Sequence, residues 1–339
     1  MVLPDFFIIG VPKAGTTALH VALARHPRLF LSRIKEPKFF LGDGPPPQRG
    51  GPGDAKTFRE RIWRREDYEA LFDDAPEGTL RGESTPFYLH DAAAQQRIAE
   101  QVPDAKLIAL LRDPVDRAHS NWAHLWSAGL EPQSDFVTAC RLESERAAAG
   151  WATFWRYLEL GLYGEQLERL YTRFPRQNVL VLRYGALREK PVETLDRICG
   201  FLGVDTGVLA EVPAENVTTH ASDSTRNRVL SAFLRVGSAA DHRLPTAWWQ
   251  RAETFLSRHL QREQRRREPL TSEQRVELVP HFVEDLELLE RLTGQSFSDW
   301  LNTTGPDGRS ALDTSGKIGT AYNSIDRPIR EREPSDQQR

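Results

Sequence analysis

The segment from Pro4 to Leu23 constrains the fold of this chain most strongly. It begins with a short apolar run, Phe6 to Ile9, passes through a turn between Gly10 and Gly15, and ends in an apolar pattern of helical period. A strand, a glycine-rich turn and a helix in this order can bind phosphate, because backbone N–H groups and the positive end of the helix dipole meet at the turn. The segment therefore predicts an α/β fold with an anion site after its first strand.

The residues inside this turn distinguish it from the loop of a nucleotide triphosphatase. Gly10 and Gly15 have the spacing of a Walker A loop, and Thr17 stands where the Ser or Thr of that loop belongs. The residue after Gly15 is Thr16 instead of lysine, and the lysine of this turn is Lys13, inside the loop. We expect the turn to hold a phosphate group while the cation approaches from the side. A plain strand-to-helix turn with a solvated lysine is the alternative.

A second anion-binding pattern follows another apolar run. Leu107 to Leu111 is continuous and of strand length, which is typical of a parallel strand buried on both faces. Arg112 comes directly after it, at the carboxyl end of the strand, where open α/β sheets bind ligands. Its guanidinium matches phosphate in shape and charge, and Ser120 adds a hydroxyl about two helical turns further on. The alternative is that Arg112 pairs with Asp113 or Asp116 and only ends the strand.

Together the two patterns resemble sulfotransferases that use 3′-phosphoadenosine 5′-phosphosulfate (PAPS). The string PKAGTT at 12–17 is similar to their 5′-phosphosulfate loop, and R-D-P-x-x-R-x-x-S from Arg112 is similar to their 3′-phosphate motif. The resemblance covers roughly residues 4–301. It implies a three-layer α/β, P-loop-like fold, with helices on both faces of a central parallel sheet built from the strands near Phe6, Leu107 and Val179.

The same resemblance implies PAPS as the sulfuryl donor, adenosine 3′,5′-bisphosphate (PAP) as the product, and no metal. In the family a late basic loop caps the nucleotide, and Arg226 is a loose match for it here, with a solvated loop as the alternative. The residues expected to bind the donor are Lys13, Ala14, Gly15, Thr16, Thr17, Arg112, Ser120 and Arg226.

The acceptor needs a general base, and the sequence offers several. Glu36 lies in the strip K-E-P-K-F-F and resembles the glutamate that is the general base of the glycan-modifying members of the family. Glu83 lies in G-E-S-T-P-F-Y-L, which resembles a second strip that lines their acceptor site. We favour Glu36 as the base, with Glu83, His119 or His20 as the alternatives.

Lysines flank the favoured base and also lie in the phosphate loop. Lys13 is expected to meet the negative charge that develops on the leaving 5′-phosphate. Lys35 and Lys38 flank Glu36, so a plain ion pair is the structural alternative for this glutamate. The same two lysines could instead contact the sulfuryl oxygens or lower the pKa of Glu36. Lys13 and Glu36 are therefore the predicted catalytic pair.

The acceptor itself is constrained only loosely. Lys38, Glu83, Ser84 and Trp122 are the expected acceptor contacts, although the rings of the aromatic segment 122–157 can equally pack helices. Ser84 stands where the glycan enzymes often carry a lysine, which puts an acidic polysaccharide in doubt. The expected reaction is transfer of the sulfuryl group to a hydroxyl of a small saccharide, glycolipid or secondary metabolite.

Length and composition fit one large soluble domain. Of the 339 residues 39% are hydrophobic and 27% charged, and the net charge of −3 argues against a nucleic-acid binder. Cys140 and Cys199 offer neither a disulfide framework nor metal-ligand spacing, so we expect a reducing, cytoplasmic location. No stretch approaches the ~18 apolar residues of a membrane span.

The carboxyl-terminal part divides into a helix and a tail. Val276 to Leu292 is expected to form one amphipathic helix. We expect a sulfotransferase domain over residues 1–302 and a polar tail over 303–339 that is disordered or draped on a surface or partner. The oligomeric state is left open.

Two other functions compete with sulfuryl transfer. A nucleotide or sugar kinase would share the fold, but it needs a lysine where Thr16 stands. A non-catalytic module that only binds the nucleotide would need neither the base Glu36 nor the cation Lys13.

Overall fold

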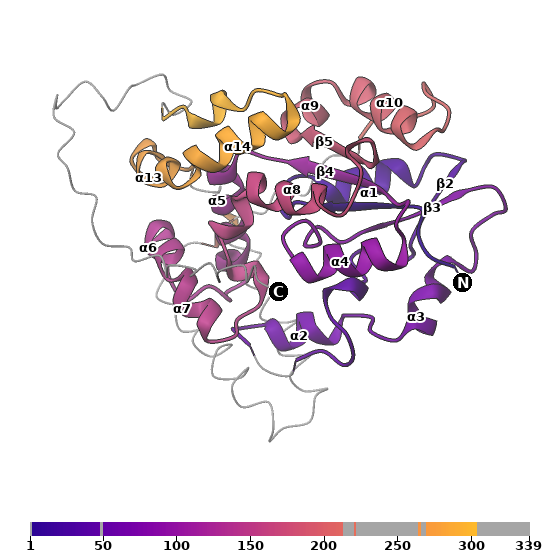
Figure 1. Cartoon of the computed structure of the whole chain (residues 1–339). Helices are drawn as coiled ribbons and strands as arrows, with labels where there is room; N and C mark the ends of the chain where they lie inside the picture. The colour runs from indigo at the N-terminus through magenta and orange to yellow at the C-terminus, as the bar shows by residue number, and fades with distance from the viewer. Residues whose placement is uncertain (1, 48–49, 213–219, 222–263, 266–268, 304–339) are drawn as a thin grey trace, which may run out of the picture.

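The computed structural model describes residues 2–47, 50–212, 220–221, 264–265 and 269–303. Its centre is a five-stranded sheet in the order β2-β3-β1-β4-β5, in which every neighbouring pair is parallel (Figure 1). The strands are β1 (Phe6–Gly10), β2 (Leu29–Leu31), β3 (Leu80–Ser84), β4 (Lys106–Leu111) and β5 (Val179–Arg183). The three predicted strands are therefore confirmed, and they lie side by side as β1, β4 and β5.

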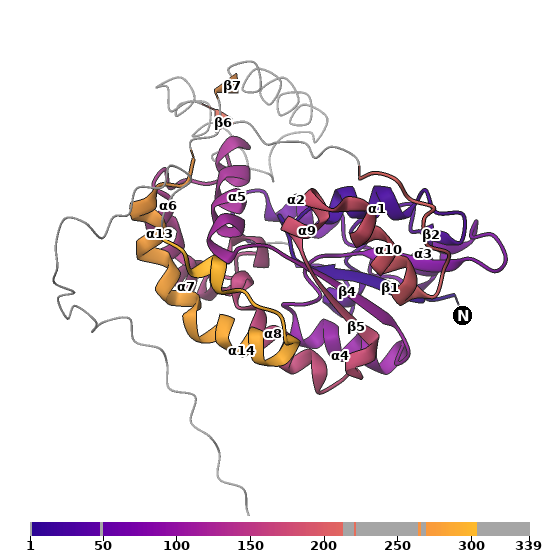
Figure 2. The ribbon, with the colours of Figure 1, turned by 90° about the horizontal axis from the view of Figure 1, so that it is seen from above.

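Helices cover both faces of this sheet (Figure 2). One face carries α1 (Thr16–Leu23), α9 (Tyr184–Glu189) and α10 (Pro191–Leu202). The other face carries α4 (Ala92–Gln101), α8 (Tyr163–Tyr171) and α14 (Val283–Thr293). The predicted three-layer α/β architecture is confirmed.

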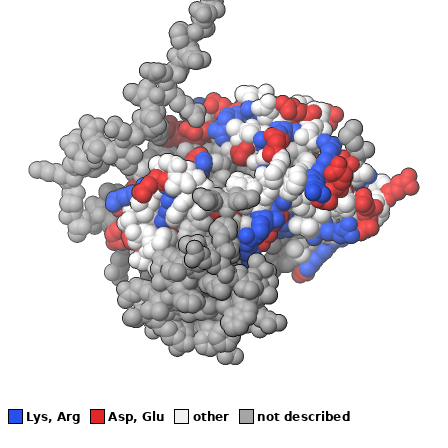
Figure 3. Space-filling model, turned by 90° about the horizontal axis from the view of Figure 1, so that it is seen from below, with Lys and Arg blue, Asp and Glu red and all other residues white. Residues whose placement is uncertain are grey.

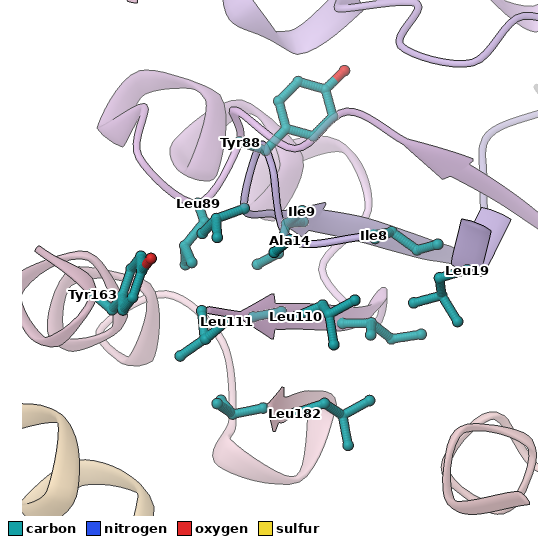
Figure 4. Packing of buried hydrophobic residues seen from close by; sticks show 14 of the residues in the cluster. Ile8, Ile9, Ala14, Leu19, Tyr88, Leu89, Leu110, Leu111, Tyr163 and Leu182 are labelled. Carbon is teal, nitrogen blue, oxygen red and sulfur yellow. The ribbon is translucent and has the colours of Figure 1, made fainter. Parts of the chain in front are cut away.

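The core is built around the central strands. All five residues of β1 are buried, as expected for a parallel strand that is covered on both faces. Leu110 and Leu111 of β4 and Leu182 of β5 continue the same cluster, and Ala14 and Leu19 pack on it from the turn and helix that follow β1 (Figure 4). The phosphate loop is thus anchored to the core at both of its ends.

A group of helices lies beyond the carboxyl ends of the strands. It includes α5 (Pro114–Ser127), α6 (Phe136–Arg141), α7 (Glu143–Ala148) and α13 (Ser272–Leu278). Helix α5 begins at a proline and is capped by Asp113, whose carboxylate accepts the N–H groups of Val115 and Asp116 at 3.0 Å. The remaining α-helices and strands of the described chain are α2 (Asp54–Arg59), α3 (Arg65–Glu69), β6 (His220–Ala221) and β7 (Gln264–Arg265).

The single helix predicted over 276–292 is wrong. The structure divides it into α13, a 3-10 turn over Val279–Phe282, and α14. The turn contains Pro280, which has no N–H to donate and whose ring clashes with the carbonyl of the residue four positions earlier in an α-helix. The α-helical pattern is therefore interrupted there.

The surface carries both charges in mixture. On the face drawn in Figure 3, Lys and Arg are interspersed with Asp and Glu over the described residues. Within the same described part of the chain, no helix combines the length and the apolar character that crossing a membrane would require.

Candidate active site

The phosphate loop links β1 to α1 through a turn with unusual backbone angles. Gly15 precedes the helix with φ 83°, and Lys13 has φ 69°. A left-handed conformation costs a non-glycine residue roughly 1–2 kcal/mol, so the turn is held by its surroundings. Successive N–H groups in such a turn form a concave cradle for an anion, with the helix N-terminus behind it.

Arg112 connects this loop to the second predicted phosphate motif. Because β1 and β4 are neighbours, their carboxyl ends lie together, and Arg112 Nη1 donates to the carbonyl oxygen of Lys13 at 3.0 Å. The guanidinium lies over the ring of Tyr184, 5.3 Å from its centroid. Tyr163 Oη donates to the carbonyl oxygen of Arg112 at 2.8 Å, and Figure 4 shows its ring beside the end of β4. Two motifs far apart in sequence therefore form one site.

The acidic residues next to Arg112 bind a different arginine. Arg275 of α13 donates to both carboxylate oxygens of Asp113 and, at 3.4 Å, to Asp116. It also donates to the carbonyl oxygens of Trp300 and Asn302. The alternative that Arg112 pairs with Asp113 or Asp116 is therefore not what the structure shows, because both aspartates pair with Arg275. This arginine fastens the first turn of α5 to the carboxyl-terminal segment.

The segment after β2 brings Glu36 to the same edge of the sheet. Its N–H donates to the carbonyl oxygen of Ser84 at 3.0 Å, and its carboxylate forms an ion pair with Lys35. The side-chain oxygen of Ser84 is hydrogen-bonded to His20 Nδ1 at 2.8 Å. Burial, and then the positive charge of Lys35, lower the pKa of His20 to about 4. The ion pair that the sequence offered as the alternative role of Glu36 is therefore present, with Lys35 as the partner, and a neutral imidazole lies beside it.

Backbone strain marks the predicted catalytic residues. Among the residues that the structure describes, the non-glycine residues with positive φ are Lys13, Glu36 and Lys38. Lys38 is buried, and its N–H donates to Thr85 Oγ1 at 3.3 Å. Strained conformations of this kind concentrate at functional sites, where the surrounding structure maintains them.

Glu83, the second carboxylate at this edge, is fully buried. Tyr68 Oη donates to Oε1 at 3.2 Å, Thr85 Oγ1 donates to Oε2 at 2.9 Å, and the hydroxyl of Tyr88 is also hydrogen-bonded to the carboxyl group. Burial raises the pKa of Glu83 to about 7, although the three hydroxyls oppose this shift. Neither of its oxygens faces the solvent.

His124 of α5 belongs to the site, and the sequence interpretation missed it. Desolvation by the surrounding protein, and then the charge of Lys13, lower the pKa of this histidine to about 4, while the charge of Glu36 acts in the opposite direction. The charges of Lys13 and Glu36 both act on this imidazole, so His124 lies in the neighbourhood of these two residues. His124 follows Ser120 by four residues, and this helical spacing is the signal that could have found it.

The other candidates on α5 are buried. Ser120 is buried, and His119 is buried against the rings of Trp122 and Phe136, at centroid distances of 5.6 and 5.1 Å. Trp122 Nε1 donates to the carbonyl oxygen of Gln133 at 3.0 Å. Arg226, like residues 304–339 of the expected tail, lies outside the described residues.

Comparison with known proteins identifies the family of this chain. A family model described as a sulfotransferase domain matches residues 86–286, which is more than half of the chain and includes Arg112. The chain belongs to the sulfotransferase family. The phosphate loop and Glu36 precede the matched residues, so their placement rests on the geometry described above.

Two human relatives show how this sulfotransferase compares with curated proteins. It is 31% identical over 203 residues to heparan sulfate glucosamine 3-O-sulfotransferase 3B1, and the alignment covers 60% of this chain and 46% of that protein. It is 32% identical over 212 residues to bifunctional heparan sulfate N-deacetylase/N-sulfotransferase 3, covering 60% of this chain and 22% of that protein. The chain therefore spans less than half the length of either relative.

A solved structure supports the fold over a longer range. The crystal structure of a sulfotransferase from Alicyclobacillus acidocaldarius matches with a TM-score of 0.68 and 28% sequence identity. The match covers 89% of this chain and 100% of the other. The P-loop-like fold expected from the sequence is thus shared with a sulfotransferase whose structure is known.

Proposed function

We propose that this sulfotransferase transfers the sulfuryl group of PAPS to a hydroxyl of a small acceptor. The observation that carries the proposal is the position of Lys13, Arg112 and Glu36 at one edge of the sheet, where Arg112 is hydrogen-bonded to Lys13, and Glu36 is hydrogen-bonded to Ser84 of the neighbouring strand β3. A loop for one anionic end of the donor, an arginine for the other end and a carboxylate at the same edge are the groups that this reaction needs.

The residues present fit the two anionic ends of the donor. The N–H groups from Ala14 to Thr17, in the strained turn before α1, suit the 5′-phosphosulfate. Arg112, at the end of β4, suits the 3′-phosphate, and Ser120 and Arg226 remain proposed contacts to the same nucleotide. When bound, PAPS supplies a sulfuryl group that is activated by its phosphate leaving group.

The protein would contribute position and charge. Glu36 accepts the proton of the acceptor hydroxyl as the acceptor oxygen forms its bond to sulfur. The bond from sulfur to the 5′-phosphate oxygen breaks with its electron pair on that oxygen, where Lys13 stabilises the negative charge. Lys35 holds the Glu36 carboxylate through their ion pair.

The residues predicted to contact the acceptor have different roles in this proposal. Lys38, in the strained turn after Glu36, would contact the sulfuryl oxygens of a bound donor. Ser84 supports Glu36 through its carbonyl oxygen, which accepts the N–H of Glu36. Glu83 supports this wall from within, because its carboxyl group is enclosed by hydroxyls. Trp122 is buried and donates to Gln133, so packing of α5, the alternative given above for the aromatic segment, is the role proposed for it.

The first test is calorimetric titration with PAP in the absence of metal. We expect micromolar binding to the wild type and a loss of about 1.5–3 kcal/mol in Arg112→Ala, the range for a hydrogen bond to a charged group. Arg25→Ala is the matched control, since that arginine is exposed and pairs with Glu211. Absence of PAP binding in the wild type overturns the proposal, and protection by ATP with Mg²⁺ instead would favour the kinase alternative.

A further inference from the structure

The turn that carries the proposed base has a backbone conformation that side chains rarely adopt. Glu36 has φ 61° and Lys38 has φ 60°, on either side of Pro37. Left-handed backbone brings Cβ close to the following carbonyl oxygen, so such a turn relaxes unless neighbouring groups hold it. The place of the Glu36 carboxylate therefore depends on what holds residues 36–40, which are called the base turn below.

Two backbone N–H groups of the base turn are bound by side-chain hydroxyls. The N–H of Lys38 donates to Oγ1 of Thr85 at 3.3 Å. The N–H of Phe40 donates to Oη of Tyr88, also at 3.3 Å. A hydroxyl that accepts an N–H must turn its own hydrogen elsewhere, so the direction of each O–H bond decides whether these contacts can form.

Both hydroxyls have the same second partner, the carboxyl group of Glu83. Thr85 Oγ1 donates to Oε2 of Glu83 at 2.9 Å, and the hydroxyl of Tyr88 is hydrogen-bonded to the same carboxyl group. Tyr68 Oη donates to Oε1 at 3.2 Å, and its ring stacks on the ring of Phe39 at a centroid distance of 4.2 Å. Each of the three hydroxyl-bearing residues around Glu83 therefore also contacts the base turn.

An ionised carboxylate is suited to this arrangement because it only accepts hydrogen bonds. Above its pKa of about 7, Glu83 draws the hydroxyl hydrogens toward itself and leaves the hydroxyl lone pairs for the N–H groups of the base turn. An amide in its place would have an NH₂ group, which donates. At least one hydroxyl would then have to turn its hydrogen away from Glu83 and toward the base turn.

Water cannot replace these hydrogen bonds. Glu83, Thr85 and Tyr88 are fully buried, and Lys38 and Phe40 are buried as well. A buried N–H that loses its acceptor is not compensated by solvent, so a hydroxyl that turned away would shift the backbone of the base turn. The carboxyl group of Glu83 and the conformation of the base turn are thus coupled through two hydroxyls.

We propose that Glu83 is a positioning residue for the general base: through the hydroxyls of Thr85 and Tyr88 it holds the strained base turn in the conformation that presents Glu36 to the acceptor. The inference rests on the proposed function, in which Glu36 accepts the acceptor proton. It replaces the acceptor contact that the sequence predicts for Glu83 with a role that acts through the backbone. A displacement of about 1 Å in a reacting group can cost about 10²-fold in rate, so a small shift of the base turn affects turnover.

Amide hydrogen exchange of the full chain tests this hydrogen-bond relay without any ligand. At about pH 8, where Glu83 is ionised, Glu83→Gln should speed the exchange of a peptide spanning the base turn by at least about tenfold. Thr85→Val, which removes one hydroxyl, should do the same. Thr172→Val is the matched control, because it removes the hydroxyl of an exposed threonine that follows α8. Unchanged exchange of the base turn in Glu83→Gln overturns the proposal.

Kinetics distinguish positioning from a general loss of structure. PAP formation from PAPS is measured with 4-nitrophenyl β-D-glucopyranoside or, where the wild type does not use it, with water as the acceptor. Thr85→Val is expected to lower kcat about tenfold while the Kd for PAP stays within about twofold. Thr85→Ser keeps the hydroxyl and should restore kcat to within about threefold of the wild type.

The same substitution in a Glu36→Gln protein completes the test. If Thr85 acts through the base, Thr85→Val should change the remaining kcat of Glu36→Gln by less than about twofold. An equal loss in both backgrounds, or an unchanged kcat in Thr85→Val, overturns the proposal.

This inference and the proposed function fail in different ways. A protein that does not bind PAP lacks the proposed function altogether. A protein that binds PAP with the expected dependence on Arg112, yet is indifferent to Thr85→Val, retains the proposed function and has a base turn that does not depend on Glu83.

Discussion

Two glutamates at the ends of neighbouring strands have opposite surroundings. Glu36 follows β2, keeps 29% of its side chain exposed and pairs with Lys35. Glu83 lies in β3, is fully buried and is surrounded by the hydroxyls of Tyr68, Thr85 and Tyr88. The same functional group is thus available for proton transfer in one case and enclosed as a support in the other, and the difference comes from the neighbours of each carboxyl group.

The largest expected effect of this contrast concerns activity. Glu36→Gln should lower kcat by about 10²–10⁴-fold, the usual contribution of a general base, because the amide cannot accept the acceptor proton. PAP formation from PAPS, with an acceptor that the wild type uses, measures the loss, and PAP titration should give an unchanged Kd. Wild-type turnover in this variant would remove Glu36 from the role of base.

A smaller effect is expected for stability at the second glutamate. Glu83→Ala should lower the free energy of unfolding by about 2–4 kcal/mol, because it leaves a cavity and buried hydroxyls without their acceptor. Urea unfolding measures the change, and Glu36→Ala is the matched control that should cost less than about 1 kcal/mol. Similar losses of stability in the two variants would show that the carboxyl groups are not held differently.

The smallest effect is the dependence of stability on pH. Because the pKa of Glu83 is raised from 4.5 to about 7 in the folded state, the folded protein holds a proton that the unfolded chain releases, and stability falls as pH rises from about 4.5 to 7. Glu143 and the histidines titrate in overlapping ranges, so the informative quantity is the difference between wild type and Glu83→Gln.

We expect the free energy of unfolding of wild type, relative to Glu83→Gln, to decline by about 1–3 kcal/mol between pH 4.5 and 7. Urea unfolding at a series of pH values gives this difference directly. Two curves that stay parallel over this range would mean that Glu83 is ionised throughout and that its buried carboxyl group is stabilised as an anion.

Part of the site was predictable because its signals are local. The strand, glycine turn and helix around Lys13, and Arg112 after an apolar strand, are patterns of adjacent residues. Such patterns report the conformation of a short segment directly, since they arise from side-chain volume, backbone freedom and periodicity within that segment. The proximity of the two motifs also followed, because carboxyl ends of parallel strands share one edge of a sheet.

Other parts of the site depend on which distant segments pack together. Nothing near Glu83 in the sequence shows that two tyrosines enclose it, and nothing near Asp113 names Arg275 as its partner. Likewise, the sequence made His119 a candidate base and missed His124, whereas packing buries His119, and the charges of Lys13 and Glu36 act on His124.

The sequence by itself determined the parallel α/β sheet, the phosphate loop and the arginine at the end of β4. Only the tertiary structure decided that Glu36 is the accessible carboxylate and that Glu83 is enclosed. The physical reason is the distance along the chain between the residues that interact. Backbone conformation follows from neighbours along the chain, whereas burial, charge state and shape depend on neighbours in space.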